Sequence, residues 1–189
     1  MCFSVIQYSK VNEKDLEQII DLYEKYLNGG KYIRNAMYEA FQTVDYLGFV
    51  AKDDERIVGF FSGQGGISFT YPQPELEKEI RTFAGERTVY NLDGLWVAEE
   101  YRNQGIAAKL IHSMKESLIQ KKMQLVLVEM WIYPGQLIPA QKPLLELGKL
   151  IYEKEIPDFY QDLDKHHITC PVCGNVCKCG ALINILKLQ

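Results

Sequence analysis

Four cysteines near the carboxyl end have the spacing most clearly suited to chemistry. They lie in the segment Cys170-Pro-Val-Cys173-Gly-Asn-Val-Cys177-Lys-Cys179. Proline and glycine favour a tight turn that points the first two sulfurs inward, and four thiolates suit tetrahedral zinc. The cluster is too compact to be a disulfide framework for the whole chain. We therefore predict a structural zinc site with ligands Cys170, Cys173, Cys177 and Cys179.

Three alternatives stay open for this cysteine cluster. The spacing is tighter than that of two separated zinc knuckles, so His166 or His167 is an alternative to one thiolate. Four cysteines also hold iron–sulfur clusters, and reduced cysteines without a metal are the simplest case. A zinc ion with four thiolate ligands has no open position for water, so its role would be structural.

A second segment joins a predicted strand to a predicted helix and has the residue types of a phosphate-binding loop. Leu95-Trp-Val97 ends the strand, and Tyr101-Arg-Asn-Gln-Gly-Ile-Ala-Ala108 leads into the helix. Its core, Arg102-Asn-Gln-Gly105-Ile-Ala107, resembles the Arg/Gln-x-x-Gly-x-Gly/Ala motif of the GNAT acetyltransferase superfamily. Alone, the hexapeptide is also typical of an ordinary helix N-cap loop. The strand before it and the apolar-periodic helix after it carry the resemblance, which covers residues 95–189.

The resemblance implies that this loop binds the pyrophosphate of acetyl-CoA. A pyrophosphate needs several converging N–H groups at a helix N-terminus, where the helix dipole also favours negative charge. Small residues allow a close approach, and Arg102 adds a charge-assisted contact. Asn103 stands where the family often has glycine, but asparagine tolerates left-handed backbone. The implied cofactor contacts are Leu95, Trp96, Val97, Arg102, Asn103, Gln104, Gly105, Ile106, Ala107 and Ala108.

The same resemblance implies where the acetyl group is transferred. In the family, the strand before the loop splays from the next parallel strand, and a backbone N–H near its end, here from Leu95 to Val97, meets the thioester carbonyl. A primary amine that attacks directly in a ternary complex must first lose a proton. Asp93, on the same strand, is our first choice of base, and Glu129 on the next strand is the reserve. The alternative is that Asp93 only caps the backbone beside Gly94.

The departing thiolate needs a proton, which many relatives take from a tyrosine. The preferred alignment of the family's helix motif puts Leu144 at the tyrosine position, and another register puts Tyr152 there. We therefore assign the acid to Tyr160, which follows a predicted strand near the acceptor mouth. Trp96, Trp131 and Tyr133 are expected to shape the acceptor and pantetheine walls, although aromatic residues on central strands are more often plain core.

Composition limits the partners. The chain of 189 residues is 47% hydrophobic and 24% charged, with a formal net charge of −4 from 21 basic and 25 acidic side chains. This balance argues against nucleic acid, and we find neither a secretory signal nor an apolar run long enough for a membrane. We expect a cytoplasmic protein. A small-molecule amine is favoured as acceptor, a protein amine stays open, and so does a homodimer.

The apolar periodicity supplies the elements that position these residues. Segments with a helical repeat are expected to form helices over 13–27, 32–44, 75–82, 104–121 and 139–147. Alternating or continuous apolar runs predict strands over 3–8, 48–52, 57–62, 89–97, 124–132, 149–156 and 181–188.

The order of these elements predicts an α/β (α+β) protein. We expect one GNAT domain over residues 1–189, in which helices flank a mixed central β-sheet in three layers. Residues 70–87 are interpreted as a surface insertion, and residues 166–180 as a Cys-rich metal-binding hairpin between the last two strands. The rival interpretation is a non-catalytic acyl-CoA-binding or zinc-stabilised interaction protein on the same fold. The missing helix tyrosine favours it, and Asp93 argues against it.

Overall fold

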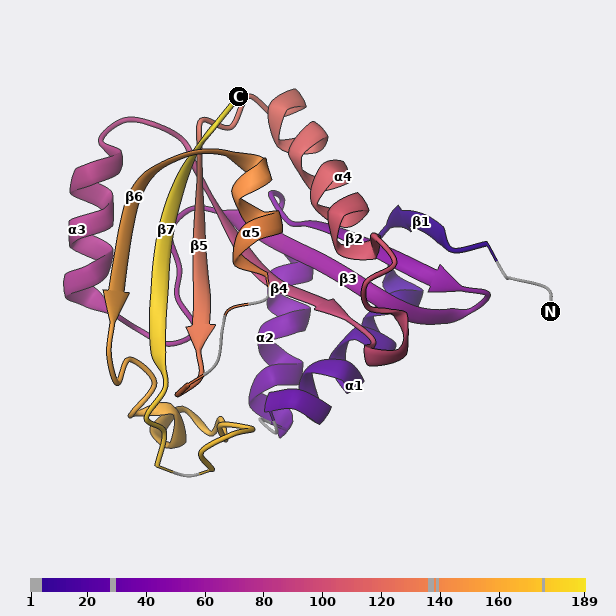
Figure 1. Cartoon of the computed structure of the whole chain (residues 1–189), viewed down its shortest axis with the longest axis horizontal. Helices are drawn as coiled ribbons and strands as arrows, with labels where there is room; N and C mark the ends of the chain where they lie inside the picture. The colour runs from indigo at the N-terminus through magenta and orange to yellow at the C-terminus, as the bar shows by residue number, and fades with distance from the viewer. Residues whose placement is uncertain (1–4, 28–29, 136–137, 139, 175) are drawn as a thin grey trace.

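The computed structural model describes residues 5–27, 30–135, 138, 140–174 and 176–189, and it contains a seven-stranded mixed sheet (Figure 1). The strand order is β1-β2-β3-β4-β5-β7-β6, and neighbours are antiparallel except β4 and β5. The strands are β1 (Gln7–Lys10), β2 (Leu47–Asp53), β3 (Arg56–Gly65), β4 (Val89–Val97), β5 (Leu125–Ile132), β6 (Gly148–Ile156) and β7 (Gly180–Leu188). The helices are α1 (Leu16–Leu27), α2 (Gly30–Gln42), α3 (Pro74–Ala84), α4 (Ile106–Gln120) and α5 (Gln141–Leu144).

Helices cover both faces of the sheet, because successive strand residues point to opposite sides. On β5, Leu125 and Leu127 belong to the core that α1, α2 and α3 cover, whereas Val126 and Val128 belong to the core under α4 and α5. The predicted three-layer fold is therefore confirmed, including the cysteine cluster between β6 and β7. No helix in the described part of the chain is long and apolar enough to cross a membrane.

Three predicted segments differ from the structure. The strand expected over 3–8 is β1, four residues whose bounds follow their pairing with β2 rather than the local alternation; residues 3–4 lie outside the described residues. The segment 70–87 contains α3, whose outer face is exposed but whose Leu76 and Ile80 are buried. The helix expected over 139–147 is α5 followed by a 3-10 turn, and Pro139 lies outside the described residues.

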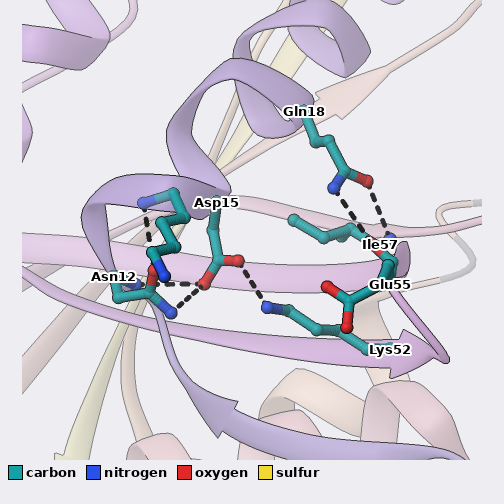
Figure 2. Close-up of polar contacts among 7 residues, drawn as sticks. Asn12, Asp15, Gln18, Lys52, Glu55 and Ile57 are labelled. Atoms are coloured by element: carbon teal, nitrogen blue, oxygen red, sulfur yellow. Dashed lines mark hydrogen bonds and ion pairs between the residues drawn. The ribbon is translucent and has the colours of Figure 1, made fainter.

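A polar network fixes the start of α1 on the β2–β3 hairpin (Figure 2). Asn12 caps the preceding 3-10 turn, and its side-chain amide donates to the Asp15 carboxylate at 2.8 Å. The other oxygen of Asp15, which is 2% exposed, accepts from Lys52 Nζ on β2 at 2.5 Å. A paired and hydrogen-bonded carboxylate can stay buried, whereas removal of one partner leaves the other charge without compensation.

One turn further on, Gln18 joins the same helix to the hairpin. Its amide donates to the carbonyl of Glu55 and accepts from the amide of Ile57, both at 3.0 Å (Figure 2). A single side chain thus satisfies a backbone donor and a backbone acceptor next to the hairpin turn. Together the two contacts set the position of α1, which carries Tyr23 toward β4.

We expect Asp15→Ala to lower the free energy of unfolding by about 2 to 4 kcal/mol, because it removes a cap and the partner of Lys52. Urea unfolding followed by circular dichroism measures this. Glu13→Ala, an exposed change in the same turn, is the matched control and should stay within about 0.5 kcal/mol of the parent. Equal effects of the two changes would contradict the role given to Asp15.

Candidate active site

The site begins where β4 and β5 stop pairing. Their parallel pairing joins residues 89–92 to residues 125–128 and ends at Leu92 and Val128. β4 nevertheless continues to Val97 and β5 to Ile132, and Figure 1 shows the two strands diverging toward their carboxyl ends. The backbone polar groups that face this gap are therefore available to a bound molecule.

A bulge in β4 lies directly at this divergence. The register with β3 pairs Phe61 with Leu95 but Gly63 with Leu92, so β4 has one extra residue there. Gly94 makes this possible, since a Cβ at this position would lie 2.1 Å from the Tyr23 hydroxyl. Bulges bend a strand and redirect its side chains. The bend turns Asp93 toward the gap.

A cavity of about 540 Å³ lies between the separated strands. Its wall includes Asp93 of β4 and Glu129 of β5, and none of the described residues in the wall is Lys, Arg or His. Trp131 and Tyr133, two of the three aromatic residues expected in the walls, line it together with Tyr160, whereas Trp96 is not among its lining residues. Such a wall combines negative charge with apolar surface, which suits an organic cation.

Asp93 faces this cavity from the wall, where the residue is exposed to solvent. One oxygen accepts from the Gly94 amide at 3.0 Å, so the capping interaction considered from the sequence is present. Burial raises the pKa of Asp93, and the Gly94 amide acts in the opposite direction. A carboxylate with a raised pKa is a stronger proton acceptor than an ordinary aspartate.

Glu129 is held more tightly. One oxygen accepts from the Thr70 hydroxyl and from the Tyr160 hydroxyl, both at 2.6 Å, and the other accepts from the Thr70 amide at 3.0 Å. Burial raises the pKa of Glu129, its hydrogen bonds lower it, and the charge of Asp93 raises it further. The three donors orient Glu129 and occupy much of its accepting capacity.

Tyr160 belongs to the same group of side chains. It is 1% exposed, and its ring stacks on Trp131 with centroids 3.9 Å apart. Burial, followed by the Glu129 charge, raises the pKa of its hydroxyl well above the ordinary value. Leu144 also lines the cavity, whereas Tyr152 lies on β6 and donates to Glu79 of α3 at 2.7 Å. The structure thus brings Asp93, Glu129 and Tyr160 into one cavity.

The loop before α4 presents a set of amides to solvent. Asn103 and Gly105 have φ values of +61° and +78°, and the first helical hydrogen bond runs from Lys109 N to Gly105 O. The N–H groups of the first turn therefore have no partner within the helix. Nothing lies within 4 Å of a Cβ built on Gly105. Arg102 Nε donates to the carbonyl of Val97 at 3.2 Å and leaves the guanidinium exposed.

Only the backbone of Ile106 can contribute to this loop, because its side chain is 2% exposed and packs in the core. Its methyl group would lie 3.0 Å from a Cβ on Gly59 of β3. That glycine lets α4 pack close to the sheet. The close packing helps to position the loop before α4 relative to the gap between β4 and β5.

The four predicted cysteines converge. Their sulfurs all lie within 4.8 Å of one another, with Cys170 and Cys173 at 3.7 and 3.6 Å from Cys179. Around zinc, with bonds of about 2.3 Å, tetrahedral sulfurs are separated by about 3.8 Å, so these thiols fit the ion. Cys173 N donates to Cys170 Sγ at 3.3 Å, which stabilises the turn. His166 stacks on Tyr71 instead of joining the cluster.

The match to a family model agrees with this geometry. Residues 16–134 match the model of the acetyltransferase (GNAT) family. The chain belongs to that family. This makes it an acetyltransferase, and the divergence of β4 and β5 lies inside the matched region. No curated protein sequence matches the chain at a significant level.

Solved structures with the same GNAT fold are distant in sequence. Arabidopsis thaliana NAA60 with a bisubstrate analogue is 18% identical, with a TM-score of 0.69 over 98% of this chain and 99% of that one; NAA60 has also been solved with acetyl-CoA. The Escherichia coli ribosomal-protein-S18-alanine N-acetyltransferase is 14% identical (TM-score 0.64, 98% and 95%). AAC(6')-Iy with a CoA-acetylneamine analogue is 18% identical (TM-score 0.52, 70% and 83%).

Sequence reasoning missed three residues of this GNAT site, namely Thr70, Tyr23 and the role of Gly94. An isolated glycine inside a strand pattern signals a bulge or a close approach, so Gly94 carried a readable signal. Thr70 reaches Glu129 from 59 residues away, and nothing local marks it. Tyr23 follows the helical repeat of α1 and looks like ordinary core.

Gly94→Ala should destabilise this site by about 1 to 3 kcal/mol through overpacking, because the new methyl group overlaps the Tyr23 ring and hydroxyl. The double variant with Tyr23→Phe removes the nearest atom, and we expect it to regain part of the loss. Thermal unfolding of both variants and of Tyr23→Phe alone measures the coupling. Additive effects would contradict the contact.

Proposed function

We propose that the chain is an acetyl-CoA-dependent N-acetyltransferase that transfers acetyl to a primary amine by direct attack in a ternary complex. The observation that carries this is the pair of carboxylates in the cavity where β4 and β5 separate. The acetyltransferase family match supports the donor, and so does the neighbouring structure with acetyl-CoA. A calorimetric titration with acetyl-CoA, followed by a thiol-release screen over amines, tests both halves.

The donor is proposed to bind across the loop and the gap. The amides of the first turn of α4 would receive the pyrophosphate, with Arg102 beside them. The Ala98 amide donates to Val58 O at 2.8 Å, so alternation along the strand turns the amides of Leu95 and Val97 away from β3. Either amide can then stabilise the oxyanion that develops on the thioester carbonyl.

The acceptor is proposed to be a small cationic amine without a carboxylate near the reacting nitrogen. Asp93 and Glu129 attract an ammonium group, and the described wall holds no cation to pair with an anionic group. Neighbouring structures include a protein-alanine acetyltransferase and an enzyme solved with an acetylneamine analogue, so a protein amine is the alternative outcome of the screen. Turnover restricted to free amino acids would contradict the proposed charge preference.

Asp93 is proposed as the base. Its carboxylate has one oxygen on the Gly94 amide and faces the cavity, whereas Glu129 already accepts three hydrogen bonds. In the reaction the amine nitrogen attacks the carbonyl carbon, the C–N bond forms and the C–S bond breaks. The amine proton passes to Asp93, which later releases it to solvent.

Asp93→Asn should lower kcat about 10² to 10⁴-fold, because an amide cannot accept the proton. In the parent enzyme, kcat should fall as the pH drops through the raised pKa of Asp93, since the base works only when ionised. A pH profile of kcat should lose this acid limb in the variant. Asp54→Asn, in the exposed β2–β3 turn, is the matched control. A parent-like profile of Asp93→Asn would exclude Asp93 as the base.

Tyr160 is proposed as the proton donor to the departing sulfur. Loss of its proton beside an ionised Glu129 would be costly, so in this step Glu129 would start in its protonated form and pass its proton to the Tyr160 oxygen as the hydroxyl proton goes to the sulfur. Glu129 would then regain a proton from solvent, which balances the amine proton that Asp93 releases. The raised pKa of Glu129 supports this relay. Glu129 then acts through Tyr160, as a positioning residue and as the reserve base.

Tyr160→Phe should lower kcat about 100-fold with little change in KM, since the ring still stacks on Trp131 while the proton is missing. Tyr152→Phe is the matched control, because it also removes a tyrosine–carboxylate hydrogen bond but lies outside the cavity. Steady-state kinetics with one amine compares them. Equal effects of the two variants would argue against Tyr160 as the acid.

We also propose that the four cysteines bind a structural zinc ion. The sulfur separations support it. Thiols that must stay reduced to bind zinc also support a cytoplasmic location. Metal analysis should find about one zinc per chain, and a strong chelator should lower the melting temperature. Iron in place of zinc would favour a cluster. Less than about half an equivalent of metal in reduced protein, with an unaltered melt, would contradict the site.

A further inference from the structure

Cys179 is the cysteine through which the cluster contacts the candidate active site. Its side chain is completely buried, its sulfur is within 3.7 Å of two other cysteine sulfurs, and the next residue begins β7. Tyr160 lies at the other end of the same connection, four residues after β6 ends at Ile156. Tyr160, near the start of this connection, lines the cavity, whereas Cys179, at its end, belongs to the cysteine cluster.

The first link between the two sites is a backbone hydrogen bond. The Tyr160 amide donates to the carbonyl of Cys179 at 3.3 Å. Between these two residues in sequence lie Cys170, Cys173 and Cys177. An ion bound by them and by Cys179 would therefore cross-link the segment between β6 and β7 to its own end. Cross-linking such a loop restricts the conformations that its base residues can adopt.

The second link is Trp131, which lies on β5 opposite Ala181 of β7. Its indole nitrogen is buried and has no conventional hydrogen-bond acceptor among the described residues. Trp131 packs against the core cluster of buried residues that contains Cys170, Cys177 and Cys179. The other side of Trp131 is the ring face that stacks on Tyr160 at 14°.

Two contacts thus lead from the metal site to the proton donor. Tyr160 is held by its amide on Cys179, by its ring on Trp131, and by its hydroxyl on Glu129 at 2.6 Å. The first two depend on where Cys179 lies. A displacement of about 1 Å in a reacting group can cost about 100-fold in rate.

We infer that the four-cysteine site sets the position of the Tyr160 hydroxyl, through Cys179 and Trp131, and so acts on the transfer rate without touching the reacting atoms. This rests on the proposed function of Tyr160. As a divalent ion binds, the thiols release their protons to solvent and four S–metal bonds form. Trp131 is a positioning residue in this arrangement.

The test starts from the zinc-loaded full chain and removes the ion with a strong chelator. We expect kcat to fall about tenfold to 100-fold, with an unchanged Kd for acetyl-CoA and full recovery when zinc is returned. In Tyr160→Phe, removal of zinc should change kcat by less than about twofold, because the group that the metal positions is absent. Equal losses in both proteins would mean general destabilisation and overturn the inference.

A second measurement does not depend on turnover. Tryptophan emission should change when zinc is removed, and the change should vanish in Trp131→Phe, which keeps Trp96. Trp131→Phe should retain zinc while lowering kcat several-fold, so it separates the link from the metal site itself. Unchanged emission, or no bound metal, would overturn the inference. If no amine is acetylated, the proposed function fails, and the emission still decides whether the metal holds Trp131.

Discussion

The loss of pairing between β4 and β5 after Leu92 and Val128 is the constraint on which the rest of the site depends. Parallel strands normally satisfy each other's amides along their whole length. Here the bulge at Gly94 turns β4 away, and the helix α1, anchored by Asp15 and Gln18, fills the space behind it with Tyr23. The sheet lacks hydrogen bonds between β4 and β5 beyond Leu92 and Val128, and this leaves backbone amides without a strand partner beside the cavity.

The electrostatics of the cavity follow from this opening. Two carboxylates from separate strands share a partly desolvated space, and burial raises the pKa of each. Their surroundings then differ: Asp93 keeps one backbone partner, whereas Glu129 accepts from Thr70 and Tyr160. Two carboxylates in different environments can take different roles. In the proposed mechanism, Asp93 accepts the proton and Glu129 orients the donor Tyr160. The aromatic wall adds apolar surface without compensating positive charge.

Local patterns predicted the parts of this structure that depend on local chemistry. The sequence predicted the loop from Arg102 to Ala107 and the clustering of the four cysteines, because few backbone conformations suit those residue types at those spacings. Tyr160 was assigned by its place after a strand, and the structure brings it to Glu129. The Thr70 contact, the buried face of α3 and the bounds of β1 were not readable, because tertiary pairing decides them. The alignment that puts Leu144 at the family's tyrosine position stays a prediction, and it would require a proton donor from another element.

A crystal structure of the zinc-loaded protein with coenzyme A would test the placement of the reaction most directly. The pyrophosphate should lie on the first turn of α4, and the pantetheine should pass between β4 and β5. The sulfur should then lie beside the amides of Leu95 to Val97, with the Tyr160 hydroxyl and Asp93 on its acceptor side. A sulfur that lies outside the gap, or away from both Asp93 and Tyr160, would contradict this arrangement.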